Sequence, residues 1–86
     1  MPETRDNDAW RQLSSDLDPV RVGLLRKYGD LSVQRRQAQL RGDGEASTVI
    51  GEQQGDVLKS QGELFRDKAI HWGEVAVRTA IELGGD

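Results

Sequence analysis

The stretch from residue 45 to residue 83 contains no proline and no cluster of turn residues, so nothing obvious in it ends a helix. Aligned every eleven residues, it reads GEQQGDVLKSQ, GELFRDKAIHW and GEVAVRTAIEL from Gly51 onward. Positions spaced 3-4-4 along this stretch are mostly apolar, with Gln54 and Gln61 among the exceptions. A period of about 3.67 residues per turn keeps a stripe nearly straight along an α-helix. The pattern therefore predicts one helix over 45–83, about 58 Å long.

Two turn signals divide the rest of the chain. Gly42-Asp43-Gly44 is the clearest of them and predicts a turn at 42–44. Asp18-Pro19 predicts a helix start, because Asp is a good N-cap and Pro suits the first helical position. A helix is therefore predicted over 19–41, with Gly29-Asp30 as the place where it could be interrupted.

These segments predict an all-α protein with a single domain over residues 1–86. Residues 4–16 predict a short N-terminal helix, since the apolar side chains of that segment recur on one face. The segment 19–41 carries a net charge of +5 and the segment 45–83 a net charge of −3, which favours their lying side by side. We therefore expect an antiparallel helical hairpin of 19–41 against 45–83, with the short helix packed on it or extending it.

Composition restricts the function more than the fold. The chain has 86 residues and no cysteine, which excludes disulfides and thiolate metal sites. No apolar run approaches the roughly 18 residues of a membrane span, and no signal peptide is visible. A cytoplasmic location is predicted, while a place in a virion and secretion without a signal remain open.

The residues of a catalytic site are not apparent. His71 is the only histidine, so one chain forms neither a histidine metal cluster nor a Ser–His triad. The glycine-rich stretches match neither the P-loop nor the dinucleotide-binding pattern. The sequence predicts a protein that is not an enzyme and that uses no cofactor.

The segment 69–83 is apolar on two faces of its predicted helix, and such a helix has to be buried on two sides. One side suits the hairpin partner, and the other indicates a second subunit or a different protein. The repeated glycines flank the apolar stripe and would let another backbone approach. We therefore predict a protein–protein interaction module that self-associates or docks as an adaptor or structural component of a larger assembly. The residues predicted for the interface are Ile70, Trp72, Gly73, Val77 and Ile81.

The basic middle segment provides an alternative function, a small nucleic-acid-binding regulator. Four of its side chains could contact phosphates, namely Arg26, Lys27, Arg35 and Arg36. The chain is acidic overall, with an isoelectric point near 5.1, and its acidic last segment could neutralise these side chains instead. Binding flat on a lipid surface is a third interpretation, which the net acidic charge disfavours.

Overall fold

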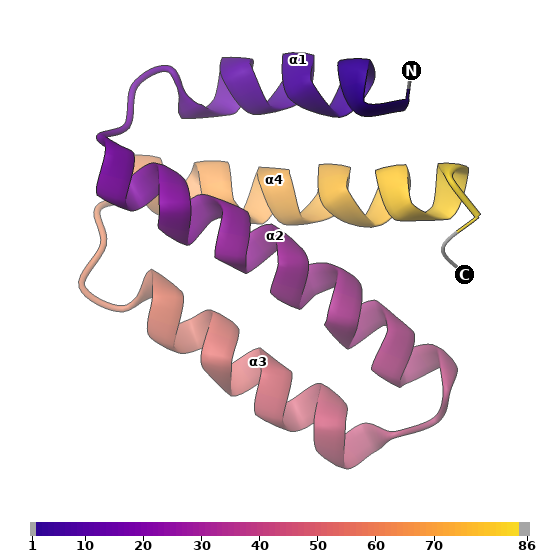
Figure 1. The fold of residues 1–86 in the computed structure, drawn as a ribbon. Coiled ribbons are helices and arrows are strands. Elements are labelled where there is room, and N and C mark those ends of the chain that lie inside the picture. The colour runs from indigo at the N-terminus through magenta and orange to yellow at the C-terminus, as the bar shows by residue number, and fades with distance from the viewer. Residues whose placement is uncertain (1, 85–86) are drawn as a thin grey trace.

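The computed structural model describes residues 2–84, with side chains from residue 7 onward, and these residues form four α-helices and no strand (Figure 1). The all-α class predicted from the sequence is confirmed. The helices are α1 (Pro2–Ser14), α2 (Pro19–Leu40), α3 (Gly44–Leu58) and α4 (Glu63–Glu82).

Helix α2 begins at Pro19, as the Asp18-Pro19 pair predicts. A side-chain oxygen of Asp18 accepts a hydrogen bond from the Arg21 backbone N–H at 2.9 Å, which satisfies one of the free N–H groups of the first turn. Gly29-Asp30 does not interrupt the helix, which continues to Leu40. The buried Gly29 instead lets the Trp72 side chain of α4 pack against α2.

The turn after α2 is a Schellman motif, and it lies at residues 41–43 rather than 42–44. Gly42 has a φ of +75°, and its N–H donates to the Gln39 carbonyl at 3.1 Å. The Asp43 N–H donates to the Ala38 carbonyl at 2.9 Å. The Asp43 side chain then accepts from the Ala46 N–H at 3.1 Å and caps α3, so that Gly44 is already the first helical residue.

The single helix predicted over 45–83 is wrong, because α3 ends at Leu58 and α4 begins at Glu63. Lys59 has φ −62° and ψ 134°, and Ser60 has a positive φ of 70°. With the Gln61 N–H donating to the Leu58 carbonyl at 3.2 Å, this is the geometry of a type II β-turn. Gly or Asn is usual at the position that Ser60 occupies, so the sequence carries no obvious signal for the turn.

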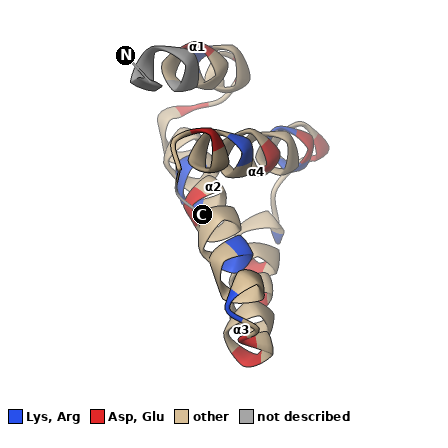
Figure 2. Cartoon of the chain, turned by 90° about the vertical axis from the view of Figure 1, so that its right-hand side faces the viewer, with Lys and Arg blue, Asp and Glu red and all other residues tan. Residues whose placement is uncertain are grey.

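Helix α2 lies between α3 and α4, and α1 packs against α4 (Figure 1). Seen edge-on, the order is α1, α4, α2 and α3, with no further layer in front or behind (Figure 2). The Cα positions extend 36 × 35 × 15 Å, so the molecule is a thin slab. The core lies mainly where α2 meets α4, and its buried apolar residues are Leu25, Leu31, Ala38, Val57, Phe65, Ala69 and Trp72.

Two glycines allow α2 and α4 to approach closely. The indole of Trp72 lies on Gly29, where an added Cβ would collide with the ring atoms Nε1 and Cδ1. Gly73 faces α2 in the same way, since a Cβ there would lie 2.5 Å from Ser32 Oγ and 3.1 Å from Tyr28 Cε1. Each helix therefore presents a glycine to side chains of the other, and the contact depends on both.

Aromatic and ionic contacts attach the N-terminal segment to this core. The rings of Trp10 and Trp72 are 5.0 Å apart between centroids and tilted by 58°, a favourable arrangement for two aromatic rings. The Arg26 guanidinium lies 4.1 Å from the centroid of the Trp10 ring. Between α1 and α2, the Asp16 carboxylate lies 3.6 Å from Lys68 Nζ of α4. Residues from α1, α2 and α4 thus meet at one place.

Candidate protein-docking groove

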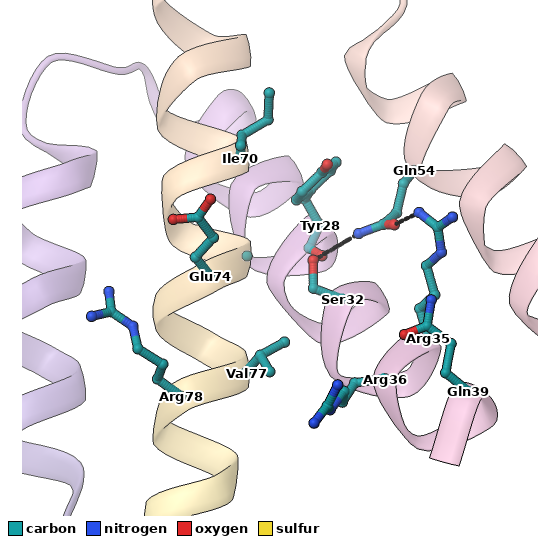
Figure 3. Close-up of a pocket in the computed structure, with 11 residues that line it drawn as sticks. Tyr28, Ser32, Arg35, Arg36, Gln39, Gln54, Ile70, Glu74, Val77 and Arg78 are labelled. Carbon is teal, nitrogen blue, oxygen red and sulfur yellow. Dashed lines mark hydrogen bonds between the residues drawn. The ribbon is translucent and has the colours of Figure 1, made fainter. Parts of the chain in front are cut away.

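Beyond their contact, the C-terminal halves of α2 and α4 diverge (Figure 1). The side chains between them leave an open groove of about 690 Å³ (Figure 3). Helix α2 forms one wall, α4 forms the other, and a single residue of α3 closes one end (Figure 3). The lining residues are Tyr28, Ser32, Arg35, Arg36 and Gln39 of α2, Gln54 of α3, and Ile70, Gly73, Glu74, Val77 and Arg78 of α4.

The wall formed by α4 is apolar and only partly covered. Ile70 is 42% exposed, and Val77, two turns further along, is half-buried. Ile81 follows one turn after Val77 and is 43% exposed. These three residues, which we call the α4 edge, lie close to one another around the helix because their spacing is near a whole number of turns. They place a line of apolar surface beside the groove.

A polar network closes the groove at its α3 end. The buried side chain of Gln54 donates from Nε2 to Ser32 Oγ at 2.7 Å. Ser32 Oγ donates in turn to the Tyr28 backbone carbonyl at 3.1 Å. Arg35 Nη1 donates to Gln54 Oε1 at 3.4 Å. The guanidinium of Arg35 also packs over Gly51, where an added Cβ would lie 3.2 Å from its Cζ. Helices α2 and α3 are thereby joined through hydrogen bonds as well as apolar contact.

This network holds the Arg35 guanidinium beside Gln54, on the side of α2 that faces α3 (Figure 3). Partial burial raises the pKa of the Tyr28 hydroxyl above its ordinary value, and the positive charge of Arg35 offsets part of that rise. The phenol is therefore neutral at physiological pH and adds an uncharged hydroxyl to the lining of the groove.

The charged side chains of the groove are mostly basic. Three arginines and one glutamate line it, which gives a net charge of +2. Arg36 extends from α2 at the mouth, while Glu74 and Arg78 stand on the outer side of α4 toward α1 (Figure 3). Among the side chains described from residue 7 to residue 84, no ion pair involves Arg36. Its charge is available to a ligand on the surface of the groove.

The structure brings together three of the five residues predicted for an interface. Ile70, Gly73 and Val77 line the groove, and Ile81 lies exposed just beyond it. Trp72 requires a correction, because it is 4% exposed and packs inside the core against Gly29 and Trp10. Its large apolar surface is used within the chain, which removes it from the candidate docking residues.

The four residues predicted for nucleic-acid contact lie in three different places. Arg35 and Arg36 line the groove. Arg26 lies over the ring of Trp10. Lys27 lines a separate shallow depression, beside Gln53 and Asp56 of α3. Phosphate-binding side chains usually follow one continuous surface, and this set does not provide one.

Sequence reasoning missed the polar side of the groove. Tyr28, Ser32 and Gln54 were not among the candidate residues, although all three line it. One signal was present, because Gln54 is one of the polar residues on a mostly apolar stripe. A buried amide needs hydrogen-bond partners. Its position therefore pointed to polar groups on the facing helix.

Among the side chains of residues 7–84, no group of three or more His, Asp or Glu is placed to hold a metal ion. In the same part of the chain, no helix is both long and apolar enough to cross a membrane. The chain matches no protein-family model, no curated protein and no solved structure at a significant level.

Proposed function

We propose that this protein is a non-enzymatic protein–protein interaction module that docks an acidic amphipathic helix of a partner protein in the groove between α2 and α4. The observation that carries the proposal is the α4 edge, an exposed apolar line beside a groove with two arginines on the opposite wall. Amphipathic helices bind in apolar grooves through side chains spaced three or four residues apart.

The dimensions of the α4 edge favour a helical ligand. The α4 edge runs over twelve residues, from Ile70 to Ile81, which is about 16 Å or three helical turns. A docked helix of similar length would cover this line with its apolar face. Its flanks would then face Arg36 on one side and the outer rim of α4 on the other.

Charge favours an acidic partner over a second copy docked face to face. Two copies meeting through their grooves would bring six arginines against only two glutamates, and like charges across an interface disfavour association. A helix with glutamates beside its apolar face would instead pair with the arginines while covering the apolar wall. The module would then serve as an adaptor or as a structural component of a larger assembly.

The proposal is tested with two designed helical peptides of about 18 residues that share an apolar face. One carries glutamate on both flanks and the other carries lysine. Fluorescence anisotropy should show binding of the acidic peptide only. The paired substitutions Ile70→Asp and Val77→Asp should weaken that binding at least tenfold, because they place charge on the apolar wall. Circular dichroism on the same samples shows whether the variant remains folded.

A matched control is available outside the groove. Val20 is 75% exposed and Val49 is 51% exposed, and neither lines the groove, so Val20→Asp with Val49→Asp adds the same two charges without touching the proposed site. Binding should be unchanged in this variant. Equal loss of binding in the two variants, or equal binding of the two peptides, would contradict the proposal.

The nucleic-acid alternative is distinguished by the same variants. If Arg35→Glu with Arg36→Glu abolished binding of a DNA or RNA strand at low salt, while Ile70→Asp with Val77→Asp left it intact, phosphate contact would be the function of this surface. Under our proposal neither nucleic acid binds, and both pairs of substitutions weaken binding of the acidic peptide.

A further inference from the structure

The connection between α3 and α4 consists of only four residues, Lys59–Gly62, and it contains a strained backbone position. Ser60 has a positive φ of 70°, a conformation that a side chain with a Cβ disfavours. Gly62, which could adopt such a conformation freely, has instead an extended backbone with φ −74°. The positive φ of the turn therefore falls on Ser60, which adopts it less readily than the neighbouring Gly62 would.

The sequence of this connection is compatible with a helix. Proline is absent from 44–84, and the 3-4-4 apolar spacing runs through the connection without a change of phase, from Leu58 through Gln61 to Phe65. If the connection became helical, α3 and α4 would form one helix over residues 44–82. Straightening would also release the strain at Ser60.

The packing of α4 determines what would follow from such straightening. Helix α4 packs mainly against α2 and α1, and it has only marginal contact with α3. A straightened chain would carry α4 away from its own α2. The surface exposed on α2 would then include Gly29 and Leu25, and a second α4 could cover it with the same Trp72 and Phe65 contacts.

We propose that two copies of this chain exchange α4, each with a continuous helix over 44–82, so that α4 of one copy packs on α1 and α2 of the other. Short hinge loops under strain favour such exchange. The buried contacts of the monomer are re-formed between copies, and the only segment that changes conformation is Lys59–Gly62. This dimer does not use the groove and does not depend on the occupant of the groove.

Two substitutions at Gly62 test the proposal in opposite directions. In the monomer an added Cβ at Gly62 meets no atom within 4 Å, so Gly62→Ala fits the closed turn. In a continuous helix Ala is more favourable than Gly by about 1 kcal/mol, which is about fivefold in an equilibrium constant. The dimer contains two such positions, so Gly62→Ala should raise its association constant roughly thirtyfold. Gly62→Pro fits the monomer because its φ is close to the value that proline imposes, but it disrupts the continuous helix.

Each variant is refolded over a range of concentrations and measured by light scattering on a sizing column. Gly62→Ala should form dimers at about thirtyfold lower concentration than the unmodified chain, and Gly62→Pro should remain monomeric. X-ray scattering should give the dimer a maximum dimension above about 58 Å, the length of a helix over 44–82. The monomer extends only 36 Å along its longest principal axis between Cα positions.

A control separates hinge effects from general helix stabilisation. Gly55 lies inside α3, where an added Cβ meets nothing within 4 Å, so Gly55→Ala favours the helix equally in both forms. Its dimerisation constant should match that of the unmodified chain. The proposal is overturned if Gly62→Ala stays monomeric at every concentration, if Gly62→Pro dimerises as readily, or if the dimer is too short to contain the continuous helix.

Discussion

Helices α3 and α4 both pack on α2, but they do so by different means. In α4 the indole of Trp72 packs directly on Gly29 of α2, and the ring of Phe65 is completely buried. Helix α3 buries only Val57 and the amide of Gln54, and the amide is tied to α2 by hydrogen bonds. Apolar burial contributes roughly in proportion to area, whereas a hydrogen bond replaces one to water and contributes little net free energy. We therefore expect the contact of α4 with α2 to contribute most of the free energy of folding. The hydrogen bonds of α3 contribute less and mainly fix how α3 is aligned on α2.

The largest expected difference between the two helices is seen when one apolar side chain is removed from each. Phe65→Ala in α4 should lower the free energy of unfolding by about 3–5 kcal/mol, because it leaves a ring-sized cavity. Val57→Ala in α3 should cost only about 1.5 kcal/mol, because it removes two carbon atoms. Urea denaturation followed by circular dichroism measures both. Equal losses would mean that α3 contributes as much to the core as α4.

The close approach of α2 and α4 is tested by two glycines of the same helix. Gly29→Ala should destabilise the protein by about 1–3 kcal/mol, since the added Cβ collides with the Trp72 ring. Gly23→Ala meets no atom within 4 Å and should stabilise by up to about 1 kcal/mol. Thermal denaturation of the two variants should shift in opposite directions. A gain in both would show that Trp72 does not rest on Gly29.

The polar attachment of α3 predicts a smaller effect. Gln54→Ala should cost about 1–2 kcal/mol, because it removes the buried amide and leaves a space behind it. Gln54→Leu fills that space with apolar atoms, and Ser32 keeps its bond to the Tyr28 carbonyl, so the loss should stay below about 1 kcal/mol. Denaturant titration distinguishes the two. An equal loss in the two variants would show that the hydrogen bonds of the amide, and not the volume it fills, attach α3 to α2.

The smallest effect concerns α1. Replacing Arg26 by Gln removes the cation beside the Trp10 ring and should cost about 0.5–1 kcal/mol. Arg36→Gln is the matched control, because among the described side chains Arg36 has no ion pair and no aromatic contact. Tryptophan fluorescence during denaturation should change its midpoint only in the first variant. If both midpoints move alike, the contact of Arg26 with Trp10 contributes nothing specific.

Local sequence signals predicted the parts of the fold that local chemistry determines. The start of α2 follows from Asp18-Pro19, and the turn after it follows from Gly42. The interruption of the last helix was not predictable in the same way, because Ser60 is not a residue that marks a type II turn. The packing of α4 against α2 and α1 keeps that turn in place. The position of the turn therefore depends on contacts throughout the core and not on the residues of the turn alone.

The groove was predictable on its apolar side and not on its polar side. Ile70 and Val77 stand out because they lie away from the main stripe of the last helix. Trp72 was misplaced because the pattern shows that a face is apolar without showing which partner covers it. The partner in this case is Gly29, a residue whose role depends on having no side chain. Helical periodicity does not indicate that a glycine on one helix leaves space for a large side chain of another.

The contact between Trp10 and Trp72 has an optical consequence. These are the two tryptophans of the chain, and their rings are 5.0 Å apart, so their fluorescence depends on the docking of α1 and α4 together. Helix α3 contains no tryptophan and no tyrosine, so its detachment alone would leave that emission nearly unchanged while the helical signal fell. If the helical circular dichroism signal falls at a lower temperature than the tryptophan emission changes, α3 is the segment that separates first.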